Sequence, residues 1–182
     1  MSRKPVKRIF ELSKTQNLGW SLRHAAILAL EALLKSDITM CSDLLDIDGQ
    51  TYVLDLIKDS EEKVPHESRM MAIQAIINLA TFQSTRSRLN MPDVIDAICT
   101  PFQFSSSISK ELKISCCNAL CQLCVDESGR EAFLKANGPC RLYNLITDTD
   151  CVPVRSAAAC LVQQLCADKT LADAFVEHKY LA

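Results

Sequence analysis

The chain repeats itself at an interval of about forty residues. Residues 132–138 read AFLKANG, and a segment of the same type, AFVEHKY, follows at 174–180, 42 residues later (174 − 132). Apolar runs with helical spacing fall between such segments. A repeat of this length with helical patterning is typical of an α-solenoid, in which successive groups of helices stack. Because a solenoid presents an extended surface, we expect its function to lie in that surface and not in a pocket.

The composition suits a large apolar interior built from helices. Hydrophobic residues make up 48% of the 182 residues and aromatic residues only 5%, with just 4 glycines and 6 prolines. Leu, Ile, Ala and Cys therefore fill the apolar positions, which favours close helix–helix packing over β-sandwich packing. The formal net charge of −2 argues against general nucleic-acid binding, and we interpret the basic start of the chain (Arg3, Lys4, Lys7 and Arg8) as a solvated terminus.

Ten cysteines raise the alternative of a disulfide scaffold. Residues 1–16 lack the apolar core of a signal peptide, and most cysteines lie inside helical apolar runs, where a thiol behaves as a small hydrophobe. We therefore expect reduced thiols and a cytoplasmic protein, with a nuclear, cytoskeletal or centrosomal location as alternatives. Apolar runs of about 18 residues are absent, so no membrane-spanning helix is predicted.

Helical runs of three lengths recur in a fixed order. Long helices are expected at 18–35, 65–81, 109–125 and 152–167. Medium helices precede them at 6–14, 50–58, 94–102 and 140–146, and shorter helices stand at 40–45, 85–89, 127–135 and 170–178. The sequence therefore predicts one domain, 1–182, with repeats at about 1–37, 38–82, 83–125 and 126–168 and a further repeat beginning at 169–182.

The predicted helix boundaries have plausible local chemistry. Ser107 or Ser109 can cap the third long helix, and Asp150 can cap the fourth. Gly49 and Gly138 fit the tight turns between the short and medium helices.

The order of short, medium and long helices resembles that of armadillo repeats. The glycine at the first turn and the residues IINLA (76–80) at the end of a long helix add to the resemblance, and 132–167 is the closest match. HEAT repeats are the nearest alternative, but they lack the separate short helix expected at 127–135. The resemblance covers essentially the whole chain. It implies an all-α, right-handed α-solenoid of about four armadillo-like repeats, whose long helices line a concave groove.

The shared register also aligns polar residues in columns. One column is basic and is spaced by 46, 44 and 42 residues: Arg23, Arg69, Lys113 and Arg155. Amides stand further along the long helices, at Gln74, Asn78, Asn118, Gln122 and Gln164. Side chains of one column should lie about 10 Å apart, since packed helices lie about that far from one another. The resemblance implies that these residues bind an acidic or carbonyl-rich peptide; the alternative is that they pair within the stack and only stabilise it.

Nuclear-import armadillo proteins offer a comparison for the amides. They carry asparagines where this chain has Asn78, Gln122 and Gln164, and tryptophans one turn earlier. The earlier place here holds Leu28, Gln74, Asn118 and Cys160. This departure argues against recognition of lysine-rich nuclear localisation signals. Amides that hold a peptide main chain, or an ordinary polar helix surface, are the two interpretations that remain.

Sites for chemistry have little support in the sequence. Cys117, Cys121 and Cys124 share a helical face, but a closed zinc site needs a fourth ligand, and we interpret the three thiols as core. The three histidines stand in different repeats without a neighbouring thiol and an orienting group. None of the 4 glycines forms a phosphate-binding loop. We expect no catalysis, no metal, no cofactor and no small-molecule substrate.

Two functional hypotheses follow. The first is a protein–protein interaction module, a scaffold or adaptor that binds a peptide or helix of a partner protein in the groove. The second is a structural segment of a larger multidomain scaffold (ubiquitin-ligase, cytoskeletal or centrosomal) that assembles through an end surface. Neither end carries the polar cap of a complete solenoid. We therefore expect either a segment of a longer array or an end that packs against a partner or a second copy.

Overall fold

The computed structural model describes residues 4–60, 62–103, 108–148 and 150–181. All regular elements of these residues are helices, twelve α-helices and one 3₁₀ helix, which confirms the all-α prediction. The helices group into two compact units, residues 1–88 and 89–182.

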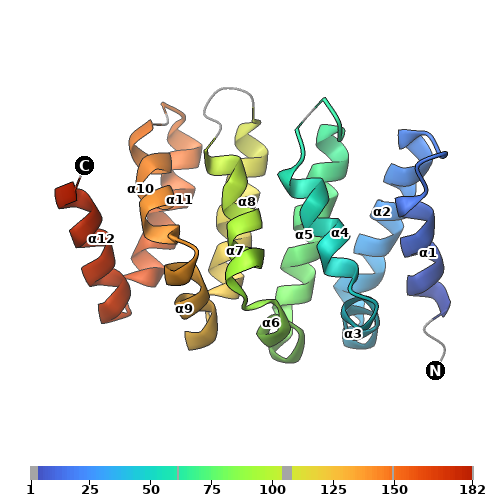
Figure 1. The fold of residues 1–182 in the computed structure, drawn as a ribbon, viewed down its shortest axis with the longest axis horizontal. Coiled ribbons are helices and arrows are strands. Elements are labelled where there is room, and N and C mark those ends of the chain that lie inside the picture. Colours follow the sequence, from blue (N-terminus) through green and yellow to red (C-terminus); the bar gives the residue numbers. More distant parts are fainter. Residues whose placement is uncertain (1–3, 61, 104–107, 149, 182) are drawn as a thin grey trace. The chain divides into compact units, whose positions relative to one another are not determined.

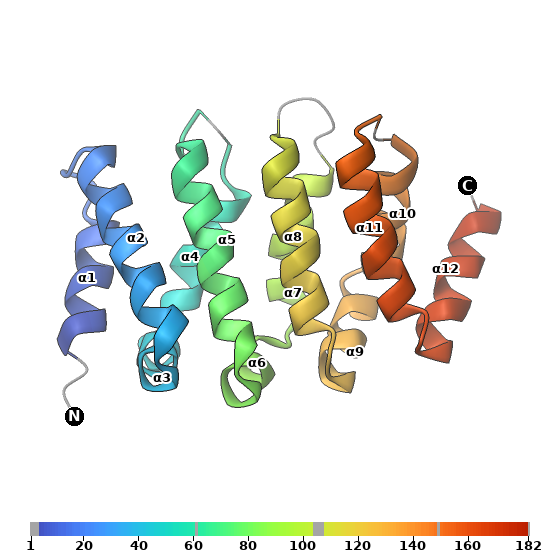
Figure 2. The same cartoon turned by 180° about the vertical axis from the view of Figure 1, so that it is seen from behind.

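The first unit holds two pairs of a medium and a long helix. Its elements are α1 (Lys4–Lys14), α2 (Trp20–Ser36), α3 (Ile38–Asp46), α4 (Gly49–Lys58), α5 (His66–Thr81) and α6 (Gln83–Leu89). The long helices α2 and α5 pack side by side in one layer, and α1 and α4 pack against them in the other (Figures 1 and 2). The short helices α3 and α6 follow the long ones, so the predicted order of lengths is present.

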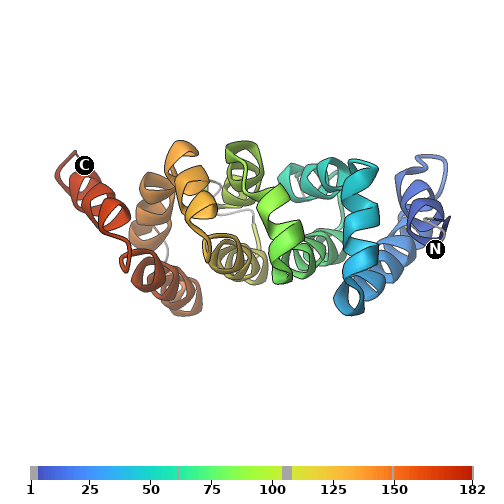
Figure 3. The same ribbon diagram turned by 90° about the horizontal axis from the view of Figure 1, so that it is seen from below.

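The second unit repeats this arrangement. Its elements are α7 (Pro92–Cys99), η1 (Thr100–Phe102), α8 (Lys110–Leu123), α9 (Glu127–Lys135), α10 (Gly138–Asp148), α11 (Val152–Leu165) and α12 (Lys169–Leu181). The long helices α8 and α11 pack side by side, with α7 and α10 behind them. Figure 3, the view from below, shows the two layers of helices in each unit.

The expected helix 140–146 is longer in the structure, Gly138–Asp148, and two further helices differ in type or in where they end. The expected helix 94–102 ends at Cys99 and continues as a 3₁₀ turn, since Pro101 has no N–H to donate to the preceding turn. The expected short helix 170–178 runs on to Leu181 as α12. The sequence there lacks the Asn137-Gly138 pair that ends the equivalent α9, so nothing stops the helix.

The core of each unit follows the common register of the long helices. Ala72 in α5, Cys116 in α8 and Ala158 in α11 occupy equivalent positions and are fully buried. Leucines ten residues after the basic column are also buried: Leu79, Leu123 and Leu165. Small side chains let neighbouring helices approach closely, and the leucines fill the layer between them.

The turns before α4 and α10 use two residues each. The left-handed backbone lies at Asp48 (φ 56°) and Asn137 (φ 55°), one position before the predicted Gly49 and Gly138. Asp and Asn tolerate this conformation better than other residues with a Cβ. The glycines are needed for space instead: a Cβ at Gly49 would overlap Leu44, and one at Gly138 would overlap the ring of Phe133.

One of the two predicted helix caps is confirmed. Ser109 Oγ accepts a hydrogen bond from Leu112 N (3.2 Å) at the start of α8, while Ser107 lies outside the described residues. The predicted Asp150 cap is wrong. Because α11 begins at Val152, the N-cap position falls on Cys151, whose side chain makes no capping hydrogen bond.

Candidate functional site

Two members of the basic column close the C-terminal ends of medium helices in the first unit. Arg69 Nη2 donates to the carbonyl of Ile57 (3.0 Å), the penultimate residue of α4. Arg23 Nε donates to the carbonyl of Ser13 (2.9 Å), the penultimate residue of α1. The last carbonyls of a helix lack partners within it, and a cation there also suits the helix dipole. Arg23 and Arg69 therefore each donate a hydrogen bond to the C-terminal end of the medium helix in their own repeat.

Aromatic residues hold Arg23 in place. Its guanidinium stacks on the ring of Trp20 at 3.9 Å from the centroid, and its Nη2 donates to Tyr52 Oη (3.3 Å). Tyr52 Oη donates in turn to the carbonyl of Ser13 (2.6 Å). This role of Trp20 was not predicted from the sequence, although its spacing of three residues from Arg23 on one helix is a usable signal.

The other two members of the basic column differ in exposure. Lys113 on α8 is 5% exposed, and burial lowers the pKa of its ammonium group, partly offset by Cys151. Arg155, in the first turn of α11, is exposed, and the structure records no hydrogen bond or ion pair for its side chain among the described residues. The column is thus buried or engaged within the fold at Arg23, Arg69 and Lys113, and it is exposed at Arg155.

The amide residues of α5 are engaged within the first unit. Asn78, 7% exposed, donates through Nδ2 to Glu31 Oε1 (2.9 Å) and to the Glu31 carbonyl (3.3 Å) on α2. Gln74 Nε2 donates to Asn78 Oδ1 (3.3 Å). These contacts link the two long helices of the unit.

The same helix-to-helix bond recurs in the second unit. Gln164 Nε2 on α11 donates to the carbonyl of Cys121 on α8 (2.8 Å). In the common register, Gln164 is the equivalent of Asn78, and Cys121 is the equivalent of Glu31. Gln164 differs from Asn78 in being exposed.

Two further amides lie on the exposed face of α8. Asn118 and Gln122 are four residues apart, so their side chains are neighbours on one face of the helix. Within the described part of the chain, neither side chain has a recorded hydrogen bond. On the adjacent α11, Gln163 and Gln164 are exposed. We call Asn118, Gln122, Gln163 and Gln164 the amide stripe of the second unit.

The cysteine cluster belongs largely to the core, as predicted. Cys117 and Cys124 are buried, and Cys121 is half-buried. Burial raises the pKa of Cys117 and of Cys124 to about 12, so both remain neutral thiols at physiological pH. The described residues include no group of three or more His, Cys, Asp or Glu side chains placed to hold a metal ion.

One histidine makes a contact that the sequence did not suggest. His24 Nδ1 lies 3.1 Å from Ser68 Oγ, which joins α2 to α5. The Ser68 hydroxyl is fully buried, so a substrate could not reach it as a nucleophile. The two residues lie on helices of successive repeats and are far apart in the sequence, so the spacing of residues along the chain does not indicate this contact.

Among the described residues, no helix has the length and apolar character needed to cross a membrane.

Comparison with known proteins identifies the fold. A designed armadillo repeat protein in complex with the peptide (KR)4 superposes with a TM-score of 0.79 at 12% identity, covering 96% of this chain and 70% of that one. Two engineered proteins of the Northeast Structural Genomics Consortium give TM-scores of 0.75 and 0.73 at 14% and 17% identity. The first match covers 98% of this chain and 70% of the engineered protein, and the second covers 96% of this chain and 68% of the engineered protein.

Sequence comparison adds no relative: no family model and no curated protein matches the chain. The structural likeness nevertheless confirms an all-α solenoid with an armadillo-like repeat fold.

Proposed function

We propose that this armadillo-like solenoid is a non-catalytic scaffold or adaptor whose amide stripe binds an extended segment of a partner protein. The proposal rests chiefly on Asn118 and Gln122, two exposed amides on one face of α8 with no recorded hydrogen bond inside the described chain. A designed armadillo repeat protein with a similar fold was solved in complex with a peptide, which supports protein binding by this kind of fold.

The spacing of the two amides suits a peptide main chain. Side chains four residues apart on a helix lie about 5–6 Å from each other, and an extended chain advances about 6.6 Å every two residues. Each primary amide offers donors and an acceptor, so it can pair with a backbone carbonyl or N–H. Asn118 and Gln122 could therefore bind alternate residues of an extended peptide.

The charge near the stripe favours an acidic peptide. Arg155 is exposed on α11, the helix that carries Gln163 and Gln164. The exposed Glu111 at the start of α8 has a cation beside it, Lys110, at 3.8 Å. We propose that Arg155 pairs with a carboxylate of the peptide. Arg23, Arg69, Lys113, Gln74 and Asn78 would then act indirectly, by holding the long helices in position.

Peptide binding can be measured directly with labelled probes. Fluorescence anisotropy would compare the peptides (DE)4 and (KR)4 on the wild-type chain and on the variant Asn118→Ala/Gln122→Ala. We expect (DE)4 to bind, and to bind at least about fivefold more weakly to the double variant, since each lost hydrogen bond is worth about 1 kcal/mol.

Asn144→Ala is the matched control, because Asn144 is an exposed amide on α10, in the other layer of the unit. It should leave binding unchanged. Absence of binding by (DE)4, or equal binding by wild type and double variant, would reject the proposed site.

The cysteines support a location in a reducing compartment, and we propose the cytoplasm. All ten are free thiols in the structure. Disulfides form and persist mainly in oxidising compartments.

A further inference from the structure

We propose that Cys121 on α8 and Cys160 on α11 are a modification site, at which a peroxide oxidises the two thiols to a disulfide that weakens peptide binding by the amide stripe. Both thiols lie within the stripe. Cys121 stands between Asn118 and Gln122, and Cys160 stands one helical turn before Gln164. The effect on binding rests on the proposed function, whereas formation of the disulfide does not.

A hydrogen bond between the two helices brings the thiols to the same place. Gln164 Nε2 donates to the carbonyl of Cys121 (2.8 Å), so the face of α11 that carries Gln164 is turned toward Cys121. Cys160 precedes Gln164 by four residues and therefore lies on that same face. Because α8 and α11 pack side by side, Cys160 and Cys121 are neighbours across the two helices.

The equivalent residues of the first unit form one connected cluster. In the common register, the equivalents of Cys121, Gln164 and Cys160 are, in that order, Glu31, Asn78 and Gln74. Gln74 donates to the amide oxygen of Asn78 (3.3 Å), and Asn78 donates to the carboxylate of Glu31 (2.9 Å). The positions that hold the two thiols in the second unit are thus linked across the long helices in the first.

Electrostatics agrees with this placement. Burial raises the pKa of the Cys121 thiol, and the nearby Cys160 raises it further. Repulsion between two thiolates falls with distance, so this effect requires sulfur atoms that lie close together. Cys117 and Cys124 share the helix with Cys121, but both are buried and stay neutral, whereas Cys160 is exposed to an oxidant.

The exposure of Cys160 belongs to its position in the repeat. The equivalent Asn118 on α8 is exposed although α11 packs against α8. The equivalent Leu28 on α2 is 47% exposed although α5 packs against α2. A following long helix therefore leaves this position open, and the exposure of Cys160 does not depend on where the sequence ends.

The oxidation is balanced with one molecule of hydrogen peroxide. The Cys160 thiolate attacks one peroxide oxygen and becomes a sulfenic acid, and the hydroxide that leaves takes up the thiol proton as water. The Cys121 sulfur then attacks the Cys160 sulfur and gives up its proton, and the sulfenic oxygen leaves as a second water. Two thiols are oxidised and the peroxide is reduced. A thiol reductant reverses the change by exchange.

The disulfide would fix the geometry of the stripe. A disulfide holds its two Cα atoms about 4.4–6.8 Å apart with a defined dihedral angle between the sulfurs. Closing it therefore sets the separation of α8 and α11 at this turn, and with it the position of Asn118 relative to Gln164. Amides on two cross-linked helices cannot adjust to a peptide main chain, so we expect the oxidised stripe to lose at least one hydrogen bond to it.

Peptide mapping tests the bond itself. The full 182-residue chain would be treated with dilute hydrogen peroxide, its free thiols blocked, and the product digested with trypsin without reductant. We expect the peptides 114–130 and 156–169 to be linked, in a monomeric chain lighter by two hydrogen atoms. Cys160→Ser and Cys121→Ser should each abolish the link. Cys166→Ser is the matched control, because Cys166 is the other exposed thiol of peptide 156–169, and it should keep the link.

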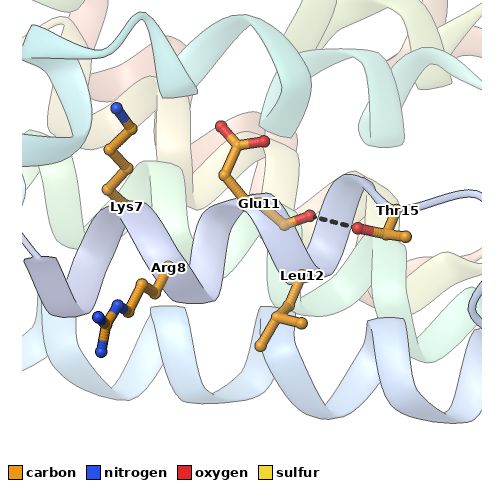
Figure 4. A pocket seen from close by; sticks show the side chains of 5 residues that line it. All are labelled: Lys7, Arg8, Glu11, Leu12 and Thr15. Atoms are coloured by element: carbon orange, nitrogen blue, oxygen red, sulfur yellow. Dashed lines mark hydrogen bonds between the residues drawn. The ribbon is translucent and has the colours of Figure 1, made fainter.

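Anisotropy with (DE)4 tests the effect on binding. The oxidised chain should bind at least about fivefold more weakly than the reduced chain, as for the loss of one hydrogen bond. Reductant should restore binding, and Cys160→Ser should bind equally with and without peroxide. Basic residues at a hollow on α1, Lys7 and Arg8, also suit an acidic probe (Figure 4). The described residues that line this hollow include no side chain that dilute peroxide oxidises, so a peroxide-dependent change reports on the stripe.

The two measurements separate the possible failures. Unlinked peptides after peroxide treatment, or a link that persists in Cys160→Ser, would overturn the proposed site. Equal (DE)4 binding by the linked and reduced chains would overturn the effect on binding. If the reduced chain did not bind (DE)4 at all, the proposed function and its regulation would both be rejected, while linked peptides would still establish the disulfide.

Discussion

The side chain of Asn78 on α5 donates hydrogen bonds to both the carbonyl and the carboxylate of Glu31 on α2. The equivalent Gln164 on α11 donates to the Cys121 carbonyl on α8. The amide position of the long helix thus bonds to the preceding long helix in both units. In nuclear-import armadillo proteins, the asparagine at this position suggests peptide binding. In this chain, the side-chain N–H groups of Asn78 donate their hydrogen bonds within the fold.

The difference in burial between the two amides predicts a difference in stability. Asn78→Ala should lower the free energy of unfolding by about 1–3 kcal/mol, since it removes the two hydrogen bonds that the buried Asn78 amide donates to Glu31. Gln164→Ala should cost less than about 1 kcal/mol, because water can replace the exposed amide. Urea denaturation followed by circular dichroism measures both, with the exposed neighbour Gln163→Ala as control. Equal losses for Asn78 and Gln164 would contradict this account.

Substitutions in the basic column should also differ in their effect on stability according to whether the residue is buried or exposed. Arg69→Met should destabilise the chain by about 1–3 kcal/mol, because it removes the donor to the Ile57 carbonyl from a buried position. Arg155→Met should change stability by less than about 0.5 kcal/mol, as expected for an exposed surface residue. In the anisotropy assay, Arg155→Met should instead weaken (DE)4 binding. A stable Arg69→Met variant would show that the capping bond contributes little.

The turn before α10 gives a prediction about two adjacent residues. Gly138→Ala should cost about 1–3 kcal/mol, because the added Cβ overlaps the buried ring of Phe133. Asn137→Gly should stay within about 0.5 kcal/mol, because glycine accepts the left-handed backbone but also loosens the unfolded chain. Thermal unfolding of the two variants side by side tests this. If Asn137→Gly lowered the stability more than Gly138→Ala did, steric overlap with Phe133 would not be the reason for glycine at position 138.

The sequence was sufficient for the order of helices but not for the roles of single side chains. Periodicity placed the long helices, and the separate helix 127–135 pointed to the armadillo arrangement, because both depend on local pattern. Arg69 could not be assigned from the pattern, since its bond to Ile57 depends on where α4 ends. The amide stripe is predicted only in part from the sequence. The common register indicates Asn118 and Gln122, but which amides form hydrogen bonds inside the protein depends on packing between helices.

The buried thiols of α8 predict how stability changes at high pH. Folding raises the pKa of Cys117 and of Cys124 from 9.0 to about 12 because burial disfavours the thiolate. Below about pH 9 both states keep the proton and the thiols have no effect on the pH dependence. Between about pH 9 and 12 the unfolded chain releases protons that the folded chain retains, so stability falls as the pH rises.

Each buried thiol should lower the free energy of unfolding by about 1 kcal/mol on going from pH 8 to pH 10. Urea denaturation at the two pH values would compare wild type with Cys117→Ala and with Cys160→Ala, which replaces an exposed thiol of α11. The loss between pH 8 and pH 10 should be smaller in Cys117→Ala than in wild type, and unchanged in Cys160→Ala. The same loss in all three proteins would mean that Cys117 ionises as easily in the folded chain as in the unfolded one.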